Sequence, residues 1–317
     1  MRNRATNFTA SGIVLLLIAV LVVVVPAALS ADDGGRTAAD FLRVGLGARA
    51  AGMGEANTAA SQGAEAAFWN PAGLTAMEGR GEVILGHFSW YQDISVEHGA
   101  CAFRLSDRVT LAASVAFVGY GDIDGYALDG SATGEQLAAY DLGAVLSAGL
   151  ALHDNLSAGI SAKLINQHLD NISAHAVALD LGLRGHLGNF SVGGALVNLG
   201  RDISFAGVAE ELPTSLRVGV AVSSWNDFLN TSVDIERPRR GSTIFRAGLE
   251  LNFQDQYYLR GGLKVRPGEA GSAVSPGPTF GAGMRLGSAD LNYAYSIGDN
   301  FTSDALHRFS LTIHIGR

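Results

Sequence analysis

Few side chains in this sequence are grouped in a way that supports chemistry. Eight histidines are scattered between positions 87 and 314, and the one cysteine, Cys101, has no neighbour that argues for a catalytic dyad, so we expect a small buried residue there. His168 and His175 stand at the edges of one expected loop, where ordinary polar loop residues explain them better than a metal site. The Gly-x-Ser-x-Gly motif of a serine nucleophile is absent. The sequence therefore predicts no enzyme, no cofactor and no metal.

A glycine pair, Gly45 and Gly47, invites comparison with a nucleotide-binding loop, whose backbone amides cradle phosphates. Position 50 is alanine where that fingerprint needs its third glycine, and no strand–helix–strand pattern surrounds it. The net charge is −8, from 22 Lys and Arg against 30 Asp and Glu. A protein this acidic is not expected to bind nucleic acid.

The elements that carry these residues follow from an alternation with a period of two, which indicates β-strands. Glycine contributes 41 residues and charged residues only 16% of the chain, a composition that suits sheets and turns. Fourteen alternating segments begin near Val83, Val96, Val109, Tyr140, Leu156, Val177, Phe190, Leu216, Leu229, Phe245, Tyr257, Phe280, Ala289 and Phe309. The predicted fold class is all-β: a single antiparallel transmembrane barrel of about 14 strands over residues 82–317, with an N-terminal plug segment in its lumen.

The connections between these segments alternate in length. Short turns such as His153-Asp154-Asn155 and Gly188-Asn189 are followed by longer connections, among them 121–137, Leu169 to Ala174 and 200–214. Strict alternation is typical of transmembrane β-barrels, which have turns at one rim and loops at the other. An even strand number returns both chain ends to the short-turn rim, which we expect to be periplasmic.

The apolar phase of each segment is expected to face lipid. A Lys or Arg on the lipid face near the midplane costs about 2–4 kcal/mol, so the charged phase must turn inward. The residues expected inside are Asp141, Lys163, Asp180, Arg184, Arg217, Asp234, Arg246, Glu250, Arg260 and Arg285. Aromatic residues near segment ends suit interfacial girdles; they are Trp90, Tyr91, Tyr120, Trp225, Phe253 and Tyr257. A water-soluble barrel with the pattern inverted is the alternative.

The first residues are interpreted as an export signal. Arg2 and Arg4 precede an unbroken apolar run of 13 residues, Ile13 to Val25, and small residues follow. This run is shorter than the ~20 residues of a spanning helix and suits a signal peptide over residues 1–31, cleaved after export through the Sec pathway. An uncleaved anchor is the alternative. The expected location is the bacterial outer membrane, with its lipid as a partner.

Residues 32–81 show no sustained alternation and form the predicted plug. They are rich in alanine and glycine; a short helix is expected from Ala59 to Ala67, and a turn or helix start at Asn70-Pro71-Ala72-Gly73. A segment this small cannot form a core of its own, so Arg49, Glu55 and Glu65 are expected to pair with charges on the barrel wall.

The plug contains two motifs that carry a resemblance: Phe-Leu-x-Val-Gly-x-Gly-Ala-Arg-Ala-x-Gly-Met-Gly from Phe41, and Trp-Asn-Pro-Ala-Gly from Trp69. Together they resemble the N-terminal signature of the PorV/PorQ family, within the wider group of FadL-like outer-membrane barrels. The motif residues are Gly45, Gly47, Arg49, Gly52, Met53, Gly54, Trp69, Asn70, Pro71 and Gly73. The resemblance implies a fourteen-stranded barrel with its N-terminal segment inside.

Two functions follow from this resemblance. PorV-type members are associated with type IX secretion, which implies an accessory or cargo-handling role with translocon components and secreted cargo domains as partners; this is the first expectation. FadL-type members pass hydrophobic small molecules, which is the alternative. The alternative predicts an apolar ligand pocket near the outer end of the plug, where Leu46, Met53, Phe68 and Trp69 converge, and a side exit opened by plug motion or a strand kink.

Overall fold

The computed structural model describes residues 37–90, 94–127, 129–266, 277–297 and 306–316. The expected signal peptide, residues 1–31, lies outside the described residues, as do residues 32–36 of the predicted plug and Tyr91. Within the described part of the chain, no helix is both long and apolar enough to cross a membrane.

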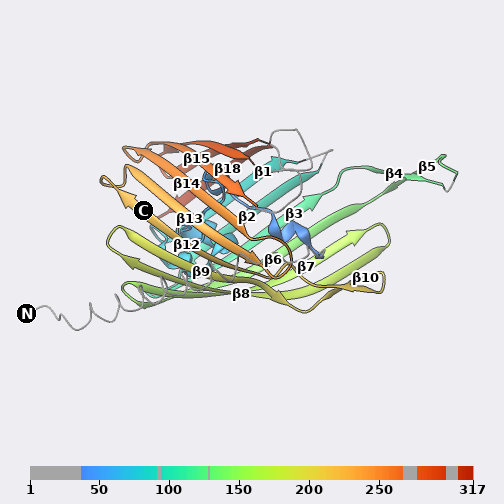
Figure 1. Cartoon of the computed structure of the whole chain (residues 1–317), viewed down its shortest axis with the longest axis horizontal. Coiled ribbons are helices and arrows are strands. Elements are labelled where there is room, and N and C mark those ends of the chain that lie inside the picture. Colours follow the sequence, from blue (N-terminus) through green and yellow to red (C-terminus); the bar gives the residue numbers. More distant parts are fainter. Residues whose placement is uncertain (1–36, 91–93, 128, 267–276, 298–305, 317) are drawn as a thin grey trace, which may run out of the picture.

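Fourteen antiparallel strands form one closed barrel (Figure 1). The barrel strands are β1 (Gly81–Ser89), β2 (Ser95–Arg104), β3 (Val109–Gly119), β6 (Ala139–His153), β7 (Leu156–Leu169), β8 (Ile172–Leu187), β9 (Phe190–Gly200), β12 (Ser215–Ser224), β13 (Leu229–Pro238), β14 (Ile244–Phe253), β15 (Tyr257–Val265), β16 (Pro278–Leu286), β17 (Ala289–Ser296) and β18 (Leu306–Ile315). The first strand pairs with the last, from Gly81 opposite Ile315 to Phe88 opposite Arg308. This closure confirms the predicted fold class, because no strand edge is left unpaired in the barrel.

Two long connections contain hairpins that the alternation did not predict. One pairs β4 (Ile123–Tyr126) with β5 (Ala132–Leu137) and projects well beyond the other strands; the other pairs β10 (Ile203–Phe205) with β11 (Val208–Glu210) (Figure 1). The long connection expected from Leu169 to Ala174 is wrong. β7 and β8 continue in register to Leu169 opposite Ile172, and only Asp170 and Asn171 form the turn. Asp170 takes φ +52, a conformation that aspartate tolerates better than most residues.

The two faces of the wall differ as predicted. Of the ten charged residues expected inside, eight are buried and Arg184 and Arg285 are partly buried. The opposite phase carries exposed apolar side chains, such as Leu146 at 69% and Leu164 at 64% exposure. The expectation for Cys101 is wrong: it is exposed, because it lies opposite Ala113 in the outward phase of β2. Such an apolar exterior suits lipid, because apolar side chains do not need contact with water.

The predicted aromatic girdle is divided between the two faces. Trp225, Phe253 and Tyr257 are exposed near short turns, as an interfacial position requires. Trp90 and Tyr120 instead pack on an apolar cluster inside the barrel. The sequence predicts aromatic residues at strand ends but not the face of the wall on which each one lies. Trp90 and Tyr120 lie just beyond the alternating segments, so the alternation says nothing about their direction.

Residues 37–80, called the luminal segment below, fold into short helical turns against the inner wall. These are η1 (Asp40–Arg43), α2 (Ala48–Gly52), η2 (Gly63–Glu65), α3 (Ala66–Trp69) and η3 (Pro71–Ala76). α2 packs on β16 and β17, and η3 packs on β6 and β7, so the segment lies within the barrel (Figure 1). The helix expected from Ala59 begins only at Gly63, whereas the start at Pro71 is confirmed, with Asn70 as its N-cap.

We predict that arginine on the outer face destabilises the barrel according to its depth. Leu146 lies near the middle of β6, and Leu152 lies on the same face near its short-turn end. Leu146→Arg is expected to lower the free energy of unfolding by about 2–4 kcal/mol, and the control Leu152→Arg by only about 0–1 kcal/mol. Guanidinium unfolding in phospholipid vesicles measures both. Equal losses at the two positions would contradict a lipid-facing exterior.

Candidate functional site

The luminal segment separates two cavities of unequal size. The smaller, called the apolar pocket, has a volume of about 60 Å³ and lies in the half of the barrel toward the long loops. The larger, called the vestibule, has a volume of about 500 Å³ and opens toward the short turns. The pocket is lined by Phe41, Leu42, Val44, Gly45, Leu46, Ala67, Phe68, Trp69, Ser114, Val115, Ala116, Gly143, Val145, Lys163 and Arg217.

Aromatic rings from the luminal segment form one side of the apolar pocket. Phe41 comes from η1, and Phe68 and Trp69 come from α3. The Trp69 ring is fixed at both ends: its Nε1 donates to the Leu46 carbonyl at 3.0 Å, and the Arg217 guanidinium lies 5.4 Å from the ring centroid. Small residues of β3 and β6 form the other side, so the pocket offers rings and aliphatic surface to a guest.

An apolar cluster continues from this pocket toward the loops. Its buried residues come from the luminal segment, from inward positions of five wall strands, and from the β10–β11 region: Ala39, Phe41, Phe88, Val96, Val118, Ile165, Ala174, Ala178, Ile203 and Leu212. The inner wall is therefore apolar at the loop ends of β1–β3 and β7–β8, whereas β12–β14 carry the buried charges Arg217, Glu236 and Arg246 within two residues of their loop ends. The sequence did not suggest this difference between the two sides.

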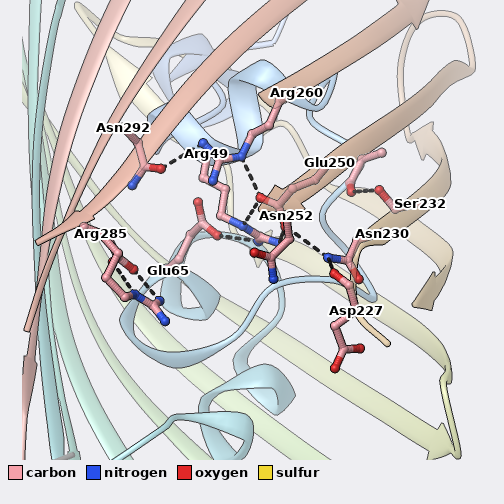
Figure 2. Close-up of polar contacts among 12 residues, drawn as sticks. Arg49, Glu65, Asp227, Asn230, Ser232, Glu250, Asn252, Arg260, Arg285 and Asn292 are labelled. Atoms are coloured by element: carbon pink, nitrogen blue, oxygen red, sulfur yellow. Dashed lines mark hydrogen bonds and ion pairs between the residues drawn. The ribbon is translucent and has the colours of Figure 1, made fainter. Parts of the chain in front are cut away.

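The floor of the vestibule is a network of ion pairs (Figure 2). Glu250 accepts from Arg49 Nε at 3.1 Å and from Arg260 Nε at 2.6 Å, and Arg49 also lies 3.4 Å from Glu65. Glu250 holds the pKa of Arg49 above its ordinary value, with Glu65 as a smaller cause. Arg260 donates further to the Asn292 side chain at 2.8 Å. This network fastens α2 to β14 and β15 and closes the inner end of the vestibule.

Glu55 is a second fastening point between the luminal segment and the wall. Its carboxylate lies 2.6 Å from Lys264, 3.5 Å from Arg308 and 3.7 Å from Arg246. Burial opposes ionisation of this group, but the three cations outweigh burial and hold the pKa of Glu55 at about 2. The neighbouring Gly54 has φ +63 and lies against the backbone of Leu263, where a side chain does not fit.

The Trp-Asn-Pro-Ala-Gly motif is used for packing. Asn70 Nδ2 donates to the carbonyls of Thr58 at 2.9 Å and Leu183 at 3.1 Å, and its Oδ1 accepts from the Ala72 amide at 3.1 Å. Pro71 lies directly on Gly159 and Gly182 of β7 and β8, which have no side chain to obstruct it. These contacts attach the luminal segment to the wall opposite the ion pairs.

The first glycine motif also contacts the wall mainly through its backbone. The Gly45 carbonyl accepts from Arg308 at 2.7 Å, and the Gly47 amide donates to His98 Nε2 at 3.1 Å. Thr279 accepts from the Gly54 amide at 3.0 Å and donates to the Gly52 carbonyl at 3.2 Å. Gly73 lies against the Ser61 carbonyl. Because glycine has no side chain, its backbone amide and carbonyl can lie directly against the wall. This explains why the segment contains so many glycines.

Three of the four residues predicted to form a ligand pocket come together. Leu46, Phe68 and Trp69 line the apolar pocket, whereas Met53 lies on the vestibule side of the luminal segment. Sequence reasoning missed Phe41, although it opens the motif, and the wall residues of β3 and β6, because alternation alone does not say which inward positions face a cavity. A ligand-binding role for these residues stays a prediction.

No group of three or more His, Cys, Asp or Glu side chains is placed to hold a metal ion within the described ranges. His168 and His175 bond instead to Ser173 and Asn166 across the β7–β8 pair.

Comparison with solved structures shows what this fold is similar to. The toluene transporter TodX of Pseudomonas putida superimposes with a TM-score of 0.61 at 16% identity, over 86% of this chain and 99% of that chain. A FadL homologue of Pseudomonas aeruginosa superimposes with a TM-score of 0.55 at 12% identity, over 89% of this chain and 99% of that chain. No family model matches the sequence. No curated protein matches it either. The chain therefore has the fold of FadL-type outer-membrane channels.

We predict that the loss of the Glu55 charge loosens the luminal segment. Because the pKa of Glu55 in the folded protein, about 2, is below its ordinary value of 4.5, its ion pairs stabilise the segment fully above about pH 5. The contribution, on the order of 3 kcal/mol, is lost as the pH falls from 4.5 through 2. Glu55→Gln should therefore speed hydrogen exchange of amides 45–55 at pH 7.

The matched control is Glu135→Gln, at an exposed position of β5. It should leave exchange in residues 45–55 unchanged. The difference between wild type and Glu55→Gln should shrink below pH 4. A difference that stays constant down to pH 2 would show that Glu55 does not fasten the segment by charge.

Proposed function

We propose that this protein is a bacterial outer-membrane channel that takes up hydrophobic small molecules. The observation that carries the proposal is the apolar pocket, with three aromatic rings, placed behind the apolar inner wall that β1–β3 and β7–β8 form at their loop ends. A hydrophobic molecule gains roughly 25 cal/mol for each Å² of apolar surface that leaves water, so this end of the lumen attracts it. The fold shared with a toluene transporter and a FadL homologue supports the same proposal.

The pocket as observed is a closed form. At about 60 Å³ it is well below the ~150 Å³ of an engineered apolar cavity that binds benzene. Phe41 and Leu42 of η1 line it, and η1 has only four residues. Three hydrogen bonds join this part of the chain to the wall and loops: the Ala39 amide donates to Gln167, the Ala38 amide to the Glu211 carbonyl, and Arg43 to the Arg240 carbonyl. Entry of a ligand therefore requires η1 to move outward.

The vestibule is an unsuitable exit for such a ligand. Its floor is the Arg49–Glu250–Arg260 network, and passage through it requires separating buried ion pairs, which costs about 3–5 kcal/mol for each pair broken. Its walls carry further ion pairs, such as Arg285 with Asp290 at 2.6 Å. A hydrophobic molecule gains nothing there to offset that cost.

The wall offers a side exit instead. The register of β8 and β9 shifts between Leu179 and Leu181, where Asp180 faces inward and Asn198 takes φ +58. A groove of about 930 Å³ lies on the outer surface at this place, lined mainly by Leu142, Ala144, Leu164, Val177, Leu179 and Leu199. Ile165 borders both this groove and the inner apolar cluster, so only the wall itself separates them. We place the route to the lipid here.

The type IX expectation receives no support from the structural neighbours. The PorV/PorQ resemblance of residues 41–74 stays a prediction from motifs, and the motif contacts described above serve to pack the luminal segment. A deletion strain separates the two functions. We expect lost uptake of labelled aromatic hydrocarbons and an unchanged secreted proteome; the opposite result would favour protein secretion.

We predict that filling the apolar pocket blocks uptake. Ala116 lines the pocket on the inward phase of β3, and Ala113 lies on the outward phase of the same strand. Ala116→Phe should reduce the initial rate of hydrocarbon uptake by about tenfold or more, because the added ring occupies the space that the ligand needs. The control Ala113→Phe places the same ring in lipid and should leave the rate unchanged. Equal uptake rates in the two variants would show that the ligand does not pass through the pocket.

A further inference from the structure

We infer that the apolar pocket selects uncharged hydrophobic molecules over carboxylic acids, and that Asp180 and Glu236 determine this specificity. The inference rests on the proposed function, since it names the class of molecule that the same pocket takes. It starts from an apparent contradiction: two cations, Lys163 and Arg217, line a pocket that is otherwise apolar. Cations in such a place normally indicate a site for an anionic head group.

Lys163 is already neutralised by its own wall. Its Nζ lies 2.8 Å from Asp180 Oδ2 and donates to Asn198 Oδ1 at 2.7 Å. The other Asp180 oxygen accepts from the Asn198 amide at 2.8 Å. Lys163, Asp180 and Asn198 thus bond to one another, and all three are buried. Asn198 also donates to the Pro213 carbonyl at 3.2 Å.

Arg217 is occupied on two sides. Its Nε lies 3.2 Å from Glu236 Oε2, directly across the β12–β13 ladder, and its guanidinium covers the Trp69 ring. Glu236 also accepts from Arg246 at 2.6 Å. The carboxylate partner of each pocket cation therefore comes from a neighbouring strand, and the charges join strands to each other.

A ligand carboxylate entering this pocket would bring another negative charge beside Asp180 and Glu236. To reach Lys163 it must displace Asp180, which would then be buried without a counter-ion, a strongly unfavourable arrangement. An uncharged molecule meets rings, aliphatic surface, the neutral Lys163–Asp180 pair, and Arg217, which covers Trp69 and shares Glu236 with Arg246. The pocket therefore discriminates by the carboxylates it already contains.

The test compares ethylbenzene with phenylacetate, which share one skeleton and differ by a methyl and a carboxylate group. Binding of each radiolabelled compound is measured by scintillation proximity at pH 7.5, with the protein in phosphatidylcholine nanodiscs. Wild type should bind ethylbenzene at least tenfold more tightly than phenylacetate. Asp180→Asn keeps an acceptor for the Asn198 amide but leaves Lys163 without its carboxylate, and should tighten phenylacetate binding about tenfold, the factor that ~1.4 kcal/mol of ion pairing supplies.

The matched control is Asp141→Asn. Asp141 is also a buried inward carboxylate, but it accepts from Tyr120 at 2.7 Å and Gln167 at 3.1 Å. This variant should leave the preference unchanged. The double variant Lys163→Met with Asp180→Asn should return the preference to that of wild type, because the unmasked cation is gone. If Asp180→Asn fails to give a folded, heat-modifiable barrel, Glu236→Gln tests the same idea at Arg217.

The outcomes separate the two proposals. Tight binding of phenylacetate by wild type, or a folded Asp180→Asn variant with unchanged preference, overturns the specificity inference and leaves the uptake proposal standing. Binding of neither compound by wild type overturns both.

Discussion

An ionised side chain cannot remain in the hydrocarbon layer, and this single constraint organises the molecule. It places the apolar phase of fourteen strands outside and turns the charged phase inward, where water is scarce as well. Those inward charges must therefore compensate one another. Directly opposed positions supply part of the answer, as with Glu250 and Arg260 or Arg285 and Asp290. The luminal segment supplies the rest through Arg49, Glu55 and Glu65. Its role in the barrel is electrostatic as much as steric.

The apolar and charged regions of the lumen lie on different sides of the barrel. The apolar cluster lines β1–β3 and β7–β8 toward the loops, whereas Arg217, Glu236 and Arg246 bring charges close to the loop ends of β12–β14. The vestibule toward the short turns is charged as well. In the proposed route a hydrophobic solute therefore follows the β1–β8 side, and the break in the β8–β9 register lies where this side reaches the outer groove.

The sequence predicted the barrel well because the lipid constraint acts on every strand residue. The alternation with a period of two therefore recurs along the fourteen segments. It also predicted the inward charges and the pairing of Arg49 and of Glu55 with charges on the wall, since a small segment without a core needs such partners. Glu65, expected to pair with the wall too, pairs with Arg49 of the same segment. It failed where a single local conformation decides the outcome. The Asp170–Asn171 turn was read as a loop because polar residues suit both. Met53 was assigned to the wrong cavity, because a glycine-rich segment reverses direction without any periodic pattern to reveal it.

The attachment of the luminal segment has a consequence for biogenesis. Residues 37–80 are synthesised before β1, yet many of the contacts that order them are made with strands synthesised later, up to β18. The luminal segment can therefore reach its folded arrangement only when the barrel strands that contact it have assembled. We expect the pairing of β1 with β18 and the docking of the luminal segment to be one cooperative event. A barrel without the segment inside would leave inward charges without partners and would be short-lived.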